Sequence, residues 1–192
     1  MAAFRTAIAL GVTTLETDLA VTSDGVLVIS HDPALNPDLV RDADGKWLAS
    51  PGPAIRTLSA ADLATYDIGR VNPESRYAKQ FPEQKPADGE RFPTLAQVFA
   101  LGGPGMRFNI EIKTDPTKPD LTLAPEPFAA LVVKAIREAK VGERTTIQSF
   151  DWRGLLAARR LAPDIATACL SIESNNMDTV GRAGGKPSPW LG

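Results

Sequence analysis

The second half of the chain alternates between strand-like and helix-like segments, and this order restricts the fold more than any other feature. A helix begins at Thr94, and strands and helices then follow one another as far as residue 172. The apolar residues of "PFAALVVKAIREAK" recur at the spacing of a helix that faces a core. The predicted strands are 107–113, 144–149 and 166–172, and the predicted helices are 94–101, 127–140 and 151–161. This alternation predicts an α/β fold with a parallel sheet.

The start of the sequence predicts a helix followed by a β-hairpin. Residues 2–10 read as a helix, and Gly11 is suited to end it. The segment "TTLETDLAVT" is rich in threonine, valine and leucine, in the manner of a strand. A turn is predicted at residues 23–25, "SDG", and a returning strand at residues 26–31, "VLVISH".

Residues 32–92 differ from the rest of the chain in composition, with many prolines and glycines and scattered charges. A short helix interrupts this segment where Ser59 and Asp62 form a capping box. We therefore expect residues 32–92 to be an insertion within a single domain that spans residues 1–192.

Composition and charge exclude several classes of protein. The chain has 192 residues, 43% hydrophobic and 23% charged, so it is long enough to bury a core. With 21 basic and 23 acidic residues it lacks the basic surface that nucleic-acid binding needs. No apolar run approaches the ~20 residues of a transmembrane helix. The single Cys169 excludes a disulfide within the chain, and we expect it to be buried in its strand.

Two of the predicted strands carry polar side chains on one whole face. In "RFNIEIK" the apolar residues share one face, and Asn109, Glu111 and Lys113 share the other. In "TLETDL" the leucines lie opposite Glu16 and Asp18. Strands of a parallel sheet are normally apolar on both faces. A strand whose second face is acidic is therefore expected to line a functional site.

The carboxylates indicate a metal site. Glu16 and Asp18, two residues apart on a strand, lie roughly 7 Å apart, and their charges repel by about 2 kcal/mol at an effective dielectric constant near 20. Glu111 supplies a third oxygen ligand for one divalent cation, Mg²⁺ or Ca²⁺. A single histidine and no cysteine cluster make zinc the weaker choice. Lys113 brings a positive charge that suits an anionic substrate.

His31 is the only histidine, and the predicted hairpin places it near these residues. Pairing about the turn makes the numbers of opposed residues sum to between 47 and 49, so His31 falls opposite residue 16, 17 or 18. A sum of 47 or 49 places the imidazole on the acidic face, as a candidate general acid or base, whereas a sum of 48 places it on the other face. The competing interpretations are a solvated edge strand for the acids, a structural histidine, and an exposed Lys113.

Four motifs, "LETDLAVTSDGVLVISHD", "PTLAQVF", "NIEIK" and "IQSFDW", occur in an order and at spacings that resemble the glycerophosphodiester phosphodiesterase family. The resemblance covers about residues 1–172. It implies a TIM-type (β/α) barrel with a small inserted subdomain at residues 32–92. It also implies metal-dependent hydrolysis of a small anionic glycerophosphodiester to glycerol 3-phosphate and an alcohol.

The same resemblance implies a role for each candidate residue. Glu16, Asp18 and Glu111 are similar to the metal ligands of the family, and His31 to one of its two catalytic histidines. Lys113 resembles the residue that contacts the phosphate or the transition state.

Some features of the family are missing from this sequence. The family opens with a His-Arg-Gly strand and a Pro-Glu-Asn-Thr segment, and neither occurs here. About four barrel strands are visible, whereas a full barrel takes about 250 residues. We therefore expect a barrel that is incomplete at both ends, a fragment with weak or absent activity.

Two alternatives remain beside the leading hypothesis. One is a phospholipase D-like relative that acts on lysophospholipid or sphingolipid headgroups, for which Trp47 is the one candidate membrane contact. The other is a binding or regulatory module that keeps the metal and lacks catalysis. The long insertion favours a periplasmic or secreted location over the cytoplasm, and the sequence does not indicate an oligomeric state.

Overall fold

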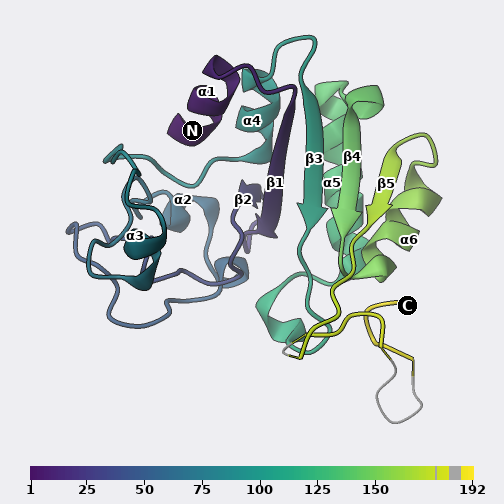
Figure 1. Ribbon diagram of the computed structural model, residues 1–192. Coiled ribbons are helices and arrows are strands. Elements are labelled where there is room, and N and C mark those ends of the chain that lie inside the picture. Colours follow the sequence, from purple (N-terminus) through teal and green to yellow (C-terminus); the bar gives the residue numbers. More distant parts are fainter. Residues whose placement is uncertain (176, 182–186) are drawn as a thin grey trace.

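The computed structural model describes residues 1–175, 177–181 and 187–192, and a five-stranded sheet forms its centre (Figure 1). The strand order is β2-β1-β3-β4-β5. Four strands are parallel, namely β1 (Thr14–Val21), β3 (Arg107–Ile112), β4 (Thr145–Ser149) and β5 (Ala166–Cys169). The short β2 (Leu27–Ile29) pairs with β1 in the antiparallel direction. The predicted parallel α/β sheet is confirmed, and its arrangement is that of an incomplete (β/α) barrel.

Helices pack against the apolar face of this sheet. They are α4 (Leu95–Leu101), α5 (Pro125–Ala139) and α6 (Trp152–Leu161), and Figure 1 shows α5 behind β3 and β4 and α6 behind β4 and β5. The main core joins their apolar residues to those of the parallel strands, including Phe108 and Ile110. The helical spacing in "PFAALVVKAIREAK" predicts a core-facing stripe, and the residues of α5 that are buried are Phe128, Ala129, Val132, Val133 and Ile136.

The helices α4 and α6 begin where the sequence predicted them. Thr94 caps α4 in a capping box with Gln97, and Asp151 caps α6. The first helix, α1 (Ala2–Ala9), ends before Gly11, which has a φ of 86°. Because only glycine adopts this left-handed conformation at little cost, the sequence stops the helix there.

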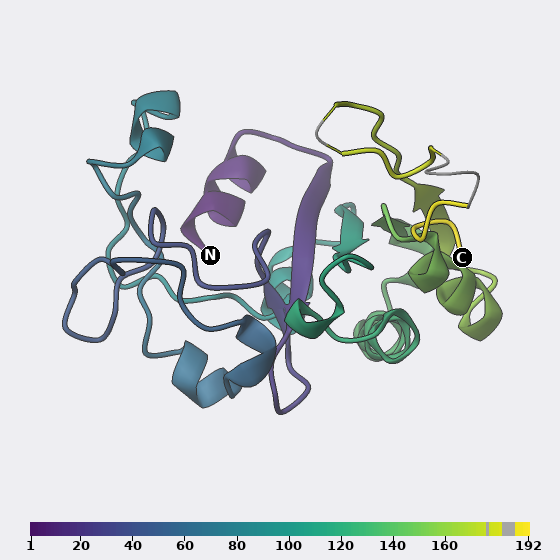
Figure 2. The ribbon, with the colours of Figure 1, turned by 90° about the horizontal axis from the view of Figure 1, so that it is seen from below.

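Residues 32–92 lie beside β1 and β2, on the side of the sheet away from β5 (Figure 2). Their regular elements are short: η1 (Ile55–Thr57), α2 (Ala60–Leu63) and α3 (Arg76–Gln80). Ser59 and Asp62 form the predicted capping box. A second, small core joins Leu35, Val40, Ile55 and Leu63 of this segment to Val28 of β2.

Two short 3-10 helices complete the described elements, η2 (Pro119–Leu121) after β3 and η3 (Gly142–Arg144) before β4. The guanidinium of Arg56 in η1 donates to the backbone oxygens of Asp120, at 3.1 Å, and Thr122, at 3.0 Å. The insertion is thereby tied to the loop that follows β3. In the described part of the chain, no helix has the length and apolar character needed to cross a membrane.

Two predictions about strands were wrong. The strand after the turn spans Leu27–Ile29 rather than 26–31, and β5 ends at Cys169 rather than at residue 172. Cys169 is exposed rather than buried. The reason is that β5 is the last strand in the sheet order, so only β4 covers one of its edges, and all four of its residues remain exposed or half-buried.

Candidate metal and catalytic site

Three carboxylates meet on the face of the sheet opposite the helices. Glu16 and Asp18 alternate with buried residues along β1, and Glu111 of β3 lies directly opposite Asp18 in the parallel register. Each of the three residues offers an oxygen atom, and these oxygens all lie within 4.8 Å of one another. The two strands that carry polar faces are thus neighbours, so their acids form one cluster.

The electrostatics of this cluster favour a bound cation. Burial raises the pKa of Glu111 to about 7, and its hydrogen bond with Asp18 contributes to the rise. Burial raises the pKa of Glu16 as well, and the charge of Asp18 adds to the shift. A set of three carboxylates fits a hard divalent cation such as Mg²⁺ or Ca²⁺, because such ions prefer oxygen ligands and the positive charge offsets the repulsion between the carboxylates.

Lys113 lies directly after β3 and reaches back to the acids. Its Nζ donates to Asp18 Oδ1 at 3.1 Å and to Glu111 Oε1 at 3.0 Å. Burial lowers the pKa of the ammonium, but the charges of Glu111 and Asp18 outweigh this, so the pKa lies above its usual value. Lys113 is therefore charged, and it partly neutralises the cluster.

The register of the hairpin decides between the alternatives that the sequence left open for His31, and it excludes the pairing that would place the imidazole on the acidic face. Leu19 pairs with Ile29 and Val21 with Leu27, so opposed residues sum to 48, and an extended strand would place His31 on the apolar face. The strand does not extend that far. After Ile29 the chain bends, and the Ser30 hydroxyl donates to the backbone oxygen of Asp32 at 2.7 Å.

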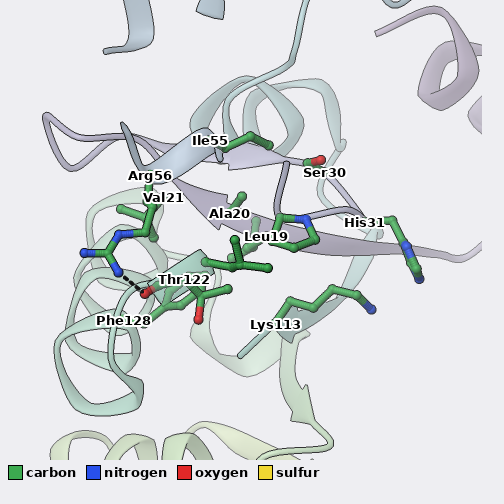
Figure 3. Close-up of a pocket in the computed structure, with 12 residues that line it drawn as sticks. Leu19, Ala20, Val21, Ser30, His31, Ile55, Arg56, Lys113, Thr122 and Phe128 are labelled. Carbon is green, nitrogen blue, oxygen red and sulfur yellow. Dashed lines mark hydrogen bonds between the residues drawn. The ribbon is translucent and has the colours of Figure 1, made fainter. Parts of the chain in front are cut away.

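This bend brings His31 to the edge of the site by another route. His31 and Lys113 line the same pocket, beside Leu19 and Arg56, and Figure 3 shows the imidazole and the lysine side chain at one end of it. The ring is exposed, and its Nδ1 lies 3.2 Å from Asp32 Oδ1. The structure therefore groups Glu16, Asp18, Glu111 and Lys113 closely and leaves His31 at their border.

One residue that contacts this cluster, Gln148, was not predicted from the sequence, and Asn109 contacts Gln148 in turn. Gln148 of β4 donates from Nε2 to Glu16 Oε1 at 2.8 Å, and Asn109 of β3 donates from Nδ2 to Gln148 Oε1 at 2.7 Å. A signal for Gln148 was present, because polar and apolar residues alternate in "TTIQS" as they do in "NIEIK". No pattern in the sequence indicated that Asp32 would contact His31.

A buried hydrogen-bond network supports the strand ends beside the site. Asp151 is fully buried and accepts from Thr114 Oγ1 at 2.8 Å, and from Nε and Nη2 of Arg153 at 2.8 and 2.6 Å. Thr114 follows Lys113 directly. Asp151 therefore joins the end of β3 to the start of α6, in addition to capping that helix.

The chain matches the model of the glycerophosphoryl diester phosphodiesterase family over residues 1–185. It is 29% identical over 171 residues to a glycerophosphodiester phosphodiesterase of Caldanaerobacter subterraneus subsp. tengcongensis, covering 88% of this chain and 59% of the relative. A glycerophosphodiester phosphodiesterase of Bacillus subtilis is also 29% identical, over 85% of this chain and 50% of the relative. The chain thus spans half to three fifths of the length of these relatives.

Solved structures are also similar to the chain. A Silicibacter pomeroyi DSS-3 protein named for this enzyme class has a TM-score of 0.83 and 31% identity, over 89% of this chain and 59% of that one. An Oleispira antarctica phosphodiesterase, solved in complex with sn-glycerol-3-phosphate, has a TM-score of 0.65 and 23% identity, over 88% and 59% of the two chains. From the family match over residues 1–185 and these similarities, the chain belongs to the glycerophosphoryl diester phosphodiesterase family.

Proposed function

We propose that this chain binds one divalent cation, Mg²⁺ or Ca²⁺, and belongs to an enzyme that hydrolyses glycerophosphodiesters to glycerol 3-phosphate and an alcohol. The observation that carries the proposal is the cluster of Glu16, Asp18 and Glu111, whose oxygens lie within 4.8 Å of one another beside Lys113. The product bound in the Oleispira antarctica structure supports a glycerol phosphate product.

Each residue has a role that follows from its chemistry. Glu16, Asp18 and Glu111 would hold the cation, which supplies charge stabilisation to the phosphodiester oxygens. Lys113, charged and on the border of the cluster, orients an anionic phosphate group by direct attraction. His31 has a pKa raised above its usual value, first by its hydrogen bond with Asp32, and it takes up or releases a proton at Nε2.

We propose further that turnover by this chain alone is weak or absent. The family resemblance implies two histidines that move protons, and His31 is the only histidine of the chain. A single imidazole cannot act as base for the nucleophile and as acid for the leaving group at the same time.

The purified chain tests these proposals through metal binding and turnover. We expect calorimetry to detect one Mg²⁺ or Ca²⁺ per chain, and Asp18→Asn and Glu111→Gln to abolish the signal, while Glu143→Gln at an exposed position leaves it unchanged. Absence of metal binding by the folded chain would refute the site. Full turnover of glycerophosphocholine would refute the proposed loss of activity.

The lipid-headgroup alternative gains no support from Trp47. Its half-buried ring packs against the guanidinium of Arg41, 5.5 Å from the ring centroid, and a backbone bridge joins the two residues. A Trp in such a contact has a structural role within the insertion. The non-catalytic alternative corresponds to metal binding without any turnover in the same experiment.

A further inference from the structure

We propose that Asp32, held in place by Asn36, is a positioning residue that fixes the tautomer of His31, with the proton on Nδ1 and with Nε2 free for proton transfer. The catalytic purpose of this arrangement rests on the proposed function. The assignment of the proton to Nδ1 depends only on contacts within residues 30–38.

The first observation is the contact between the two side chains. His31 Nδ1 lies 3.2 Å from Asp32 Oδ1. An ionised carboxylate only accepts hydrogen bonds, so this contact forms only when Nδ1 carries a hydrogen. A neutral imidazole then has its lone pair on Nε2, the ring nitrogen away from Asp32.

The second observation is that the carboxylate is held on its other side. Asn36 Nδ2 donates to Asp32 Oδ2 at 2.7 Å. The orientation of the Asn36 amide is set in turn, because its Oδ1 accepts from the backbone N–H of Asp38 at 2.9 Å. The amide of Asn36 must therefore present its donor to Asp32, and it leaves Oδ1 of Asp32 facing the imidazole.

The charges around the imidazole come from several elements. Asp32 is its direct partner, whereas Lys113, Asp18 and Glu16 act on it through space. Arg70 lines the hollow that His31 and Asp32 share on the insertion side, where it pairs with Asp88. Among these, Asp32 hydrogen-bonds to the ring in the described structure, so changing Asp32 alters the tautomer without removing a candidate metal ligand.

Nuclear magnetic resonance of the histidine nitrogens tests the inference directly. Because His31 is the only histidine, a ¹⁵N-histidine-labelled chain gives one pair of ring nitrogen signals, and these report the tautomer and the pKa. We expect mainly the Nδ1–H form in the metal-free parent protein above the pKa of His31. A dominant Nε2–H form in the parent would overturn the inference.

Asp32→Asn gives the sharper test. In this variant Asn36 would still donate to the amide oxygen at position 32, so the NH₂ group at position 32 faces His31 Nδ1. Nδ1 must then accept a hydrogen bond, and the imidazole carries its proton on Nε2. We expect the ratio of tautomers to shift about three- to tenfold toward Nε2–H, since the contact is exposed to solvent. The pKa of His31 should fall, because the carboxylate that holds it above its usual value is gone.

Asp44→Asn is the matched control, because it removes one negative charge from an exposed position of the same insertion. Asn36→Ala is a second variant, in which the freed carboxylate turns away and the Nδ1–H fraction falls. An unchanged ratio in folded Asp32→Asn and Asn36→Ala overturns the inference. The measurement needs neither metal nor turnover, so a parent with the Nδ1–H form and no metal binding refutes the proposed function alone.

Discussion

Replacing Glu111 by Gln should stabilise the metal-free protein at alkaline pH, although the variant loses a candidate metal ligand. The carboxyl of Glu111 is buried beside Asp18, and this raises its pKa from 4.5 to about 7. The folded state therefore holds a proton that the unfolded state has already released. Gln imitates the protonated carboxyl, because its Nε2 can donate to Asp18 and its Oε1 can accept from Lys113.

The expected size follows from the difference between the two pKa values. A carboxyl whose pKa is raised in the folded state destabilises that state progressively as the pH rises from the unfolded value to the folded one. Between about pH 4.5 and about pH 7, the folded state loses about 1.4 kcal/mol for each step of one in pH, which gives a penalty of about 3 kcal/mol above pH 7. Below about pH 4.5 the two proteins should be equally stable, since Glu111 is protonated in both states.

Urea unfolding in the presence of a chelator measures this difference. The free energy of unfolding of Glu111→Gln should exceed that of the parent by about 3 kcal/mol near pH 8 and converge with it below about pH 4.5. Glu143→Gln, at an exposed position, should track the parent at every pH. A variant that is less stable than the parent near pH 8, or a difference that does not change with pH, would refute the reasoning. With saturating Mg²⁺ or Ca²⁺ the order should reverse, because only the parent binds the cation.

Three further predictions concern residues around the site. Gln148→Ala should weaken metal binding about tenfold or more by calorimetry, because Glu16 loses the donor that orients it; an unchanged affinity would exclude this role. Asp151→Ala should lower the free energy of unfolding by about 1–3 kcal/mol in urea titrations, since it leaves the buried hydroxyl of Thr114 without its acceptor and α6 without its cap; an unchanged free energy of unfolding would contradict the network. Cys169 should react with a thiol reagent in the native protein as fast as in the unfolded protein, and a reaction that requires denaturant would show that this thiol is buried.

The sequence was most informative where polar and apolar residues alternate along a strand. The alternation in "TLETDL" and "NIEIK" predicted that Glu16, Asp18 and Glu111 share a polar face, and the parallel register of β1 and β3 places them together. The predicted starts of the helices at residues 94 and 151 also agree with α4 and α6, because a helix start depends on a few neighbouring residues, here the N-caps Thr94 and Asp151.

The sequence was least informative where the outcome depends on distant contacts. His31 lies near Lys113 because the chain bends after Ile29. The predicted hairpin instead continued as a strand to residue 31, so the sequence predicted the neighbourhood of His31 but not the backbone conformation that produces it. The burial of Cys169 depends on which strands flank β5, and composition does not contain that information. The contact of Gln148 with Glu16 joins residues 132 positions apart.

The strand β2 has a dynamic consequence, because it belongs to two cores at once. Leu27 packs into the main core and Val28 into the core of the insertion, since successive side chains of a strand point in opposite directions. Two small cores joined by one short strand can open separately, with different rates of amide hydrogen exchange. His31 follows this strand, so a loosening of the insertion would move the imidazole while the carboxylates on β1 and β3 stay fixed. The contacts of Arg56 with the backbone after β3 tie this segment to the strand that precedes Lys113, so a weakening of these contacts would shift the imidazole relative to Lys113.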